Sequence, residues 1–228
     1  MFEINDNEPA STHAIIFANG RLGNPPEISD ADLIIAADGG AINCLELGLV
    51  PSAVVGDMDS IDDATQRRLV ESGCSLIRHP ARKDFTDLEL ALDYAIEKGA
   101  SEISIIAALG ARWDQTLANL LLPASQKYSK LTICLVDGEQ TIQIVRAGEP
   151  TSISGKPGDT VSLIPVAGDA GGITTHGLEY PLQDGSLSLG GTRGISNVMQ
   201  ADRATISLRK GIMVIVHIGA GMSIDTDE

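Results

Sequence analysis

The sequence predicts an α/β domain followed by a smaller all-β domain. In the first half, short apolar runs alternate with helical patterns, which is typical of a mostly parallel sheet with helices on both faces. After Asp137-Gly138 the helical patterns stop, and short apolar runs alternate with Gly, Asp and Pro turns, which indicates an antiparallel sandwich or barrel. We therefore expect a doubly wound α/β domain in residues 1–137 and a β-sandwich or barrel domain in residues 138–228.

The first half contains six apolar runs that predict strands: His13–Ala18, Leu33–Ala37, Ala53–Val55, Ser75–Ile77, Ile103–Leu109 and Leu131–Val136. Helical patterns lie between them at Ala41–Leu47, Asp62–Glu71, Thr86–Lys98 and Gln115–Tyr128. The third pattern is the clearest, because its apolar residues recur at i, i+3, i+4, i+7 and i+8. It begins with a capping box, Thr86 and Glu89, and it ends at Gly99.

The second half predicts five short strands: Thr141–Val145, Thr160–Ile164, Leu187–Leu189, Ala204–Leu208 and Met213–His217. Turn signals separate them, such as Asp184-Gly185 and Lys210-Gly211. The sequence contains no internal repeat.

Composition excludes several classes of protein. The net charge of −15 over 228 residues argues against nucleic acid or an anionic membrane as a partner, although metal ions and local cations could still admit a nucleotide substrate. The N-terminus lacks a signal-peptide pattern, and no apolar run approaches the roughly 20 residues of a membrane helix. The cysteines, Cys44, Cys74 and Cys134, are isolated, which predicts free thiols in a cytoplasmic protein.

Four acidic blocks follow apolar runs in the first half: Ala37-Asp38-Gly39-Gly40, Gly56-Asp57-Met58-Asp59-Ser60, Lys83-Asp84-Phe85-Thr86-Asp87 and Arg112-Trp113-Asp114-Gln115. The carboxyl ends of parallel strands share one edge of the sheet, where ligands bind. Carboxylates gathered there repel one another unless a cation lies between them. A divalent cation that bridges to phosphate satisfies this requirement.

Each block also has a structural explanation. If its strand stays extended, Asp57 and Asp59 point to the same side and suit a hard cation, but Asp59 or Ser60 could instead cap the next helix. Asp84 and Asp87 could be acids of a helix N-terminus, and that same N-terminus beside Lys83 could hold a phosphate.

The remaining blocks also have both a functional and a structural explanation. Arg112 can grip phosphate oxygens, and Asp114 is placed as a helix N-cap. Trp113 could stack on a ring, although interior packing is favoured. Asp38-Gly39-Gly40 allows close approach to a ligand or entry into a helix. In the second half, the glycines before Ser196-Asn197 could admit a flat ligand or form a β-bulge.

The ordered set of blocks resembles the thiamine pyrophosphokinase family. The matching segments are Asn19-Gly20, Ala37–Ala41, Gly56–Ile61, Lys83–Leu88, Gly110–Asn119 and Gly194–Asn197, and together they span nearly the whole chain. The resemblance implies an α/β domain that binds ATP and a β domain that helps to bind thiamine. It also implies a homodimer with the thiamine pocket where the two subunits meet.

The resemblance also assigns roles to individual residues. Asp57, Asp59 and Asp87 resemble Mg²⁺ ligands, and Lys83 and Arg112 resemble the cations that stabilise charge during transfer. The surroundings of ATP correspond to Asp38, Lys83, Asp84, Thr86, Arg112 and Asp114, and those of thiamine to Gln115, Ser196 and Asn197. Two features depart from the family. Ala111 stands where a second Gly is common. Animal members of the family place an aromatic ring of the C-terminal domain against the pyrimidine of thiamine, whereas here Tyr180 is the only aromatic residue after Tyr128.

The implied reaction transfers the diphosphoryl group of ATP to the hydroxyl of thiamine and yields thiamine diphosphate and AMP. It depends on positioning and charge neutralisation, and one of the aspartates would accept the hydroxyl proton. Two alternatives remain open. One is a diphosphokinase of the same fold that acts on another acceptor, such as a hydroxymethyl pterin. The other is a non-catalytic acidic protein that binds a cation or a nucleotide.

Overall fold

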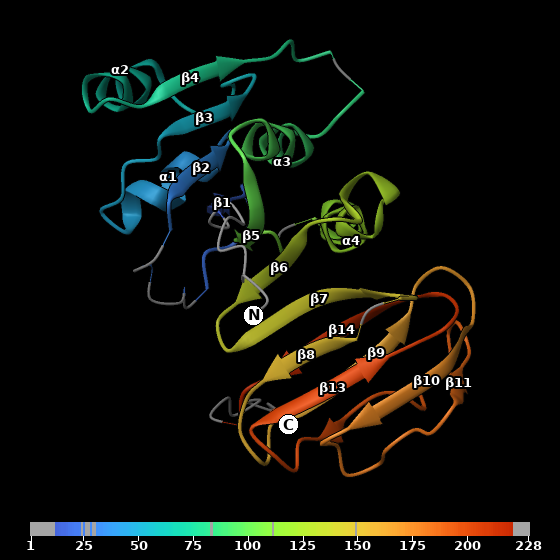
Figure 1. Cartoon of the computed structure of the whole chain (residues 1–228). Helices are drawn as coiled ribbons and strands as arrows, with labels where there is room; N and C mark the ends of the chain where they lie inside the picture. Colours follow the sequence, from blue (N-terminus) through green and yellow to red (C-terminus); the bar gives the residue numbers. More distant parts are fainter. Residues whose placement is uncertain are drawn as a thin grey trace, which may run out of the picture. The chain divides into compact units, whose positions relative to one another are not determined.

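The computed structural model describes residues 12–23, 25, 28, 31–82, 84–110, 112–148 and 150–220. Contacts within the chain divide it into two compact units. The described parts of residues 12–19, 28–105 and 130–132 form the first unit, and those of residues 20–27, 106–129 and 133–220 form the second. Figure 1 labels helices and strands of both units.

The first unit is built on a parallel sheet. Its strands are β1 (Thr12–Phe17), β2 (Leu33–Ala37), β3 (Ala53–Gly56), β4 (Ser75–Arg78) and β5 (Ala100–Ile106), in the order β5-β1-β2-β3-β4. The pairs β1–β2, β2–β3 and β3–β4 are all parallel. The strand order reverses at β1, because β2 lies on one side of β1 and β5 lies on the other. In open α/β sheets ligands bind at such a reversal.

Three helices cover this sheet: α1 (Gly40–Glu46), α2 (Asp63–Glu71) and α3 (Asp87–Glu97). Helix α1 packs on β1 and β2, α2 packs on β4, and α3 packs across β1, β2 and β3. The predicted stripe of α3 is buried at Leu88, Ala91, Leu92 and Ala95, which fixes the helix on the sheet. The predicted cap is also present, because the Thr86 side chain accepts a hydrogen bond from the Glu89 N–H.

Helix α4 (Trp113–Leu121) in the second unit is shorter than predicted. Two 3₁₀ turns, η1 (Leu122–Ala124) and η2 (Gln126–Tyr128), replace the second half of the expected Gln115–Tyr128 helix. Pro123 lies in the first turn, has no N–H to donate and restricts the residue before it, so the α-helix ends there.

The second unit contains two sheets. One has the strands β6 (Thr132–Asp137), β7 (Gln140–Arg146), β9 (Thr160–Pro165), β12 (Asn197–Val198) and β14 (Ile212–Ile218), in the order β12-β9-β14-β7-β6. The other has β8 (Thr151–Ser154), β10 (Ala170–His176), β11 (Gly185–Leu187) and β13 (Arg203–Ser207), in the order β11-β10-β13-β8. All pairings within these sheets are antiparallel.

One apolar core joins the two sheets into a sandwich. Val145, Val161 and Ile215 come from the first sheet, and Ile173 and Ile206 come from the second. This core confirms the predicted β-sandwich, and with the parallel sheet it confirms the predicted fold class. The apolar faces of the two sheets exclude water from each other, and burial of apolar surface is the main stabilising contribution to a β-sandwich.

Other predictions concern the linker, the thiols and membranes. Strands β6 and β7 form a hairpin in which Asp137 pairs with Gln140, so the predicted domain boundary between residues 137 and 138 lies in its turn and stays a prediction. The three cysteines are free thiols, as expected. Among the described residues, no helix is long and apolar enough to cross a membrane.

Candidate active site

The acidic blocks of the first unit lie at the carboxyl edge of its parallel sheet. Asn19 follows β1, Asp38 follows β2 and Asp57 follows β3. Asp87 begins α3, after the segment that leaves β4. Their common position results from parallel pairing, which brings the ends of all these strands to one edge.

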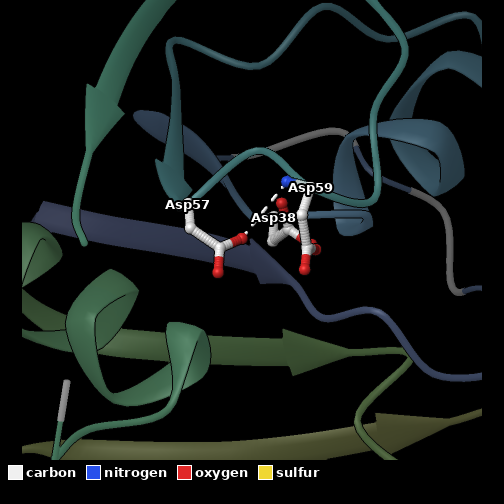
Figure 2. Close-up of side chains that lie close together, drawn as sticks. All are labelled: Asp38, Asp57 and Asp59. Carbon is white, nitrogen blue, oxygen red and sulfur yellow. Dashed lines mark hydrogen bonds between the residues drawn. The ribbon is translucent and has the colours of Figure 1, made fainter. Parts of the chain in front are cut away.

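Asp38, Asp57 and Asp59 form a cluster of carboxylates (Figure 2). One oxygen from each lies within 4.8 Å of the others. Asp38 is only 4% exposed, and its Oδ1 has no hydrogen-bond partner among the described residues. A buried oxygen without a partner, close to two further carboxylates, is destabilising until a positive ion compensates for it. Three hard oxygen ligands fit Mg²⁺, so this cluster is a candidate cation site.

The local backbone directs Asp38 into this position. Its φ of +44° is a left-handed conformation that aspartate tolerates, and its N–H donates to the carbonyl oxygen of Val55. Gly39 and Gly40 then begin α1. A Cβ on Gly40 would lie 2.0 Å from the carbonyl oxygen of Phe17, so the glycine is required for packing against β1. Of the two explanations for this pair of glycines, the structure supports entry into a helix.

The Asp57–Asp59 segment is a turn, and it is not extended as the motif alone suggested. Met58 has φ +68° and is buried, and the Asp59 N–H donates to Asp57 Oδ1 over 3.2 Å. Gln66 of α2 stabilises the turn by donating to the carbonyl oxygens of Met58 and Ile61. The two carboxylates therefore meet through a closed turn that another helix holds in place.

The capping alternative for this block is wrong, because Asp62 is the N-cap of α2. Its side chain accepts the Thr65 N–H over 2.7 Å. This hydrogen bond lowers the pKa of Asp62, since it favours the charged carboxylate. Asp59 and Ser60 remain outside the helix and available to the acidic cluster.

Asn19 supports the cluster in a way that sequence reasoning missed. Its Nδ2 lies 3.4 Å from Ser60 Oγ, and Ser60 Oγ donates to Asp59 Oδ1 over 3.1 Å. The Asn19 side chain fits because Gly39 has no Cβ, which would lie 2.5 Å from it. The Asn19-Gly20 block was the sequence signal for this role, but by itself it predicts only a turn at the same edge of the sheet.

Asp87 lies near this cluster but is not one of its three members. A Cβ on Gly56 would lie 2.9 Å from Asp87 Oδ1, so this carboxylate faces the end of β3. The assignment of Asp87 as a metal ligand stays a prediction. Asp84 is exposed, Thr86 caps α3, and Lys83 lies outside the described residues.

The Arg112 block belongs to the second unit. Arg112 donates to Asp114 through Nε (3.1 Å) and Nη2 (2.5 Å), and both side chains are exposed. The hydrogen bond from Arg112 lowers the pKa of Asp114, and the same bond raises the pKa of Arg112. Arg112 is held in a fixed orientation by this fork, although its remaining donors stay open to an anion.

Two predictions about this block are wrong. Asp114 lies in the first turn of α4 and is not its N-cap, which is Arg112 and makes no side-chain cap. Trp113 is 82% exposed, so it does not pack in the interior. Helix α4 buries Thr116, whereas Trp113 and Gln115 in its first turn are exposed.

The Gly194–Asn197 segment lies against β9. The Leu163 N–H donates to the carbonyl oxygen of Gly194, and a Cβ on Gly194 would lie 2.2 Å from the Leu163 carbonyl oxygen. Gly194 is therefore required by this close contact between backbones. Ser196 adopts φ +58°, and Ser162 Oγ accepts its N–H. Asn197 and Gly194 line a pocket of about 310 Å³.

The fold and the site together define a class: an α/β unit with a candidate cation site at its sheet edge, joined to a β-sandwich with its own pocket. Two family models match this chain. The model for the thiamin pyrophosphokinase catalytic domain matches residues 25–135, and the model for the thiamin pyrophosphokinase vitamin B1 binding domain matches residues 139–213.

Individual relatives agree with these matches. The thiamine pyrophosphokinase of Bacillus subtilis (strain 168) is 35% identical over 184 residues, which cover 81% of this chain and 86% of that protein. The crystal structure of thiamine pyrophosphokinase from Bacillus subtilis has a TM-score of 0.80 at 31% identity, covering 92% of this chain and 99% of that one. The thiamin pyrophosphokinase structure from Geobacillus thermodenitrificans has a TM-score of 0.77 at 27% identity, covering 94% and 99%.

The chain belongs to the thiamine pyrophosphokinase family. The resemblance that the ordered sequence blocks indicated is therefore confirmed.

Proposed function

We propose that this protein is a thiamine diphosphokinase, which transfers the diphosphoryl group of ATP to the hydroxyl of thiamine. Thiamine attacks the β-phosphorus, and AMP leaves. Family membership supports this reaction. The observation that carries the proposal is the Asp38–Asp57–Asp59 cluster with its buried, unpartnered oxygen, because transfer of a diphosphoryl group from the polyanion ATP requires a cation at the site.

The acidic cluster is the proposed magnesium site. Asp57 and Asp59 are the ligands expected from the sequence, Asp38 supplies a third oxygen close to them, and Asp87 approaches from the start of α3. When bound, Mg²⁺ supplies charge neutralisation for the phosphate oxygens and for the carboxylates that face them. Without it, these carboxylates repel ATP, so the protein should bind the nucleotide poorly.

The other predicted residues bind and orient the two substrates. Asp84, Thr86 and Asp114 surround the ATP, and the cations Lys83 and Arg112 stabilise the charge that grows on the phosphoryl oxygens. Gln115, Ser196 and Asn197 belong to the thiamine side. One of the aspartates Asp57, Asp59 and Asp87 accepts the proton of the thiamine hydroxyl as that oxygen attacks.

The family also supports proposals about assembly and location. We propose a homodimer with a thiamine site at the subunit interface, and a cytoplasmic location that fits the free thiols. A sizing column run at assay concentration tests the first proposal, and a monomer there would contradict it.

The match to a vitamin B1 binding domain over residues 139–213 favours thiamine over a hydroxymethyl pterin as the acceptor. It also disfavours a protein that only binds a cation or a nucleotide. Activity measured with a panel of acceptors distinguishes thiamine from a hydroxymethyl pterin. Calorimetry with Ca²⁺, in the presence and absence of nucleotide, tests whether the protein only binds a cation or a nucleotide.

The decisive experiment is incubation with ATP, Mg²⁺ and thiamine, followed by separation of the nucleotides and the thiamine species. We expect AMP and thiamine diphosphate in equal amounts. ADP with thiamine monophosphate would place the attack at the γ-phosphorus and overturn the mechanism. Asp57→Asn should abolish turnover and leave the fold intact, and a near-normal rate in saturating Mg²⁺ would remove Asp57 from the metal site.

A further inference from the structure

The turn between Asp57 and Asp59 has a conformation that it would not keep on its own. Met58 adopts φ +68° although it is not a glycine, and its side chain is only 3% exposed. Bulky residues adopt this left-handed region only where the surrounding structure imposes it. The carboxylates on either side of Met58 also repel each other. The turn therefore needs contacts from other elements to keep its shape.

Gln66 of α2 supplies two of these contacts. Its Nε2 donates to the carbonyl oxygen of Ile61 over 2.7 Å and to that of Met58 over 3.3 Å. The side chain of Gln66 is half-buried, so water replaces these bonds poorly. Because two carbonyl groups of the turn are fixed in this way, Met58 cannot rotate to a more common conformation without breaking a hydrogen bond.

Arg78 holds the other end of the same amide. Its Nη2 donates to Oε1 of Gln66 over 2.5 Å. A guanidinium can only donate hydrogen bonds, and a carbonyl oxygen can only accept them. With Arg78 on one side and two carbonyl oxygens on the other, the Gln66 amide has a single orientation in which all of these groups are satisfied.

This arginine comes from the end of the next strand of the sheet. Arg78 is the last residue of β4 and pairs with Gly56, the last residue of β3 and the neighbour of Asp57. Helix α2 packs on β4. The hydrogen bonds therefore run from the end of β4, through Gln66 of α2, to the turn that follows β3, and all of these residues belong to the first unit.

We propose that Gln66 and Arg78 are positioning residues for the magnesium site. Arg78 fixes the amide of Gln66, and this amide holds the turn in which Asp57 and Asp59 approach Asp38. Neither side chain is a metal ligand, because the Gln66 oxygen is bonded to Arg78 and a guanidinium is a cation. Carboxylates that are held together before the ion arrives need not be ordered by it, which raises the affinity for Mg²⁺. This proposal rests on the proposed function, since it concerns the metal site of that reaction.

Binding of Mg²⁺ in the absence of nucleotide tests the proposal. In calorimetry with Mg²⁺ alone, Gln66→Ala should bind the ion about tenfold more weakly than the wild type, and Arg78→Ala about threefold more weakly. In the Gln66→Ala background, Arg78→Ala should have no further effect, because Arg78 acts through the amide. The rise in melting temperature that Mg²⁺ produces should shrink in the same order. If Gln66→Ala does not fold, Gln66→Met takes its place, since it keeps the length of the side chain and loses the donor.

The Gln66→Glu variant separates positioning from charge. A glutamate still accepts the hydrogen bond from Arg78, but it places an oxygen against two carbonyl oxygens that can only accept. The proposal therefore predicts Mg²⁺ binding at least about tenfold weaker than in the wild type. Charge alone predicts the opposite, because an added carboxylate attracts a cation. Tighter binding by the glutamate variant would overturn the proposal.

Arg67 provides the matched control for Arg78. It is exposed, and it lines the same groove of about 360 Å³ as Gln66 and Arg78. Arg67→Ala removes the same charge and leaves the bond between Arg78 and Gln66 in place, so it should not weaken Mg²⁺ binding. Equal changes in Arg67→Ala and Arg78→Ala would indicate a general charge effect and overturn the proposal.

The same measurements distinguish this proposal from the proposed function. Wild-type affinity for Mg²⁺ in both Gln66 variants would overturn the positioning role, while the diphosphokinase reaction stands. A wild-type protein that does not bind Mg²⁺ would overturn both the magnesium site and the positioning role. If the wild type binds Mg²⁺ and the variants bind it more weakly, the positioning role is supported, and absence of AMP formation from ATP and thiamine would then reject the proposed reaction alone.

Discussion

The imidazole Nε2 of His217 lies 2.8 Å from Oδ2 of Asp159, and this contact joins the last strand, β14, to the turn that precedes β9. Both side chains are largely buried. Asp159 also accepts the N–H groups of Lys156 and Ala220, so one carboxylate organises three segments of the sandwich. Gly155 is needed beside it, because a Cβ there would lie 2.5 Å from Asp159 Oδ2.

This contact predicts a pH-dependent stability. Burial acts to raise the pKa of Asp159, but the N–H groups of Lys156 and Ala220 and the His217 side chain outweigh burial and lower it. Because the pKa is lower in the folded state, the carboxylate stabilises the protein above the unfolded-state pKa, and that contribution is lost as the pH falls through the folded-state pKa. Urea unfolding between pH 7 and pH 3 should show Asp159→Asn less stable by about 2 kcal/mol at pH 7.

The difference between wild type and Asp159→Asn should shrink at the acid end of that series. Asp202→Asn, an exposed acid in the same unit, serves as the control and should follow the wild type throughout. A difference that stays constant down to pH 3 would show that the charge of Asp159 does not contribute.

Asp38→Asn should affect stability and activity in opposite directions. Neutralising one of three crowded carboxylates relieves repulsion, so without metal the variant should be more stable by about 1 kcal/mol. Turnover should fall by about 100-fold, because a ligand of the proposed magnesium site is lost. Thermal melts with and without Mg²⁺, beside a rate assay, measure both effects.

Asp63→Asn provides the comparison for Asp38, because Asp63 is an acid of the same unit in the first turn of α2 and outside the cluster. It should leave the response to Mg²⁺ unchanged. An Asp38→Asn protein that Mg²⁺ still stabilises as strongly as the wild type would exclude Asp38 from the site.

Thr86 has two expected roles, as the cap of α3 and beside ATP, and both depend on its hydroxyl group. Thr86→Ala removes the cap of α3, which should cost about 1 kcal/mol of stability and should also slow turnover. Thr86→Ser keeps a hydroxyl at the cap, so both properties should return to near the wild-type values. The measurements are denaturant unfolding and kcat/KM for ATP, and a serine variant as impaired as the alanine variant would contradict the role of the hydroxyl.

Arg112→Gln should reduce turnover without a measurable loss of stability. The Arg112–Asp114 pair is exposed, and exposed pairs contribute little to folding. In the proposed reaction the Arg112 guanidinium stabilises the charge that grows on the phosphoryl oxygens, so its loss slows turnover. The exposed pair of Arg209 and Asp184 in the same unit offers a matched control. Arg209→Gln should leave kcat unchanged, and equal losses in both variants would indicate a general charge effect.

Strands and helices with strong periodicity could be predicted from the sequence. The range Leu33–Ala37 is that of β2, and the stripe and cap of α3 are both present. The predicted strand Ile103–Leu109 is shifted by three residues relative to β5, because a continuous apolar run has no periodic signal at its ends. Strand β10 was not predicted, because Gly171 and Gly172 weaken the strand pattern, and Gly172 adopts φ +66° there.

The candidate site was also predicted only in part from the sequence. Asp57 and Asp59 were identified as a pair, but the role of Asn19 depends on a side chain that fits over Gly39, which no spacing along the chain reveals. Trp113 was expected in the interior because large aromatic side chains are usually buried, and its exposure is decided by how α4 packs.

By itself, the sequence determined the family, the two-part architecture and the residue types at the sheet edge, because these depend on local periodicity and on blocks that stand in order along the chain. Only the tertiary structure decided that Asp38 joins Asp57 and Asp59, and that the amide of Gln66 is held by Arg78. Both are contacts between residues far apart in sequence, and such contacts depend on strand order and on packing geometry rather than on local preference.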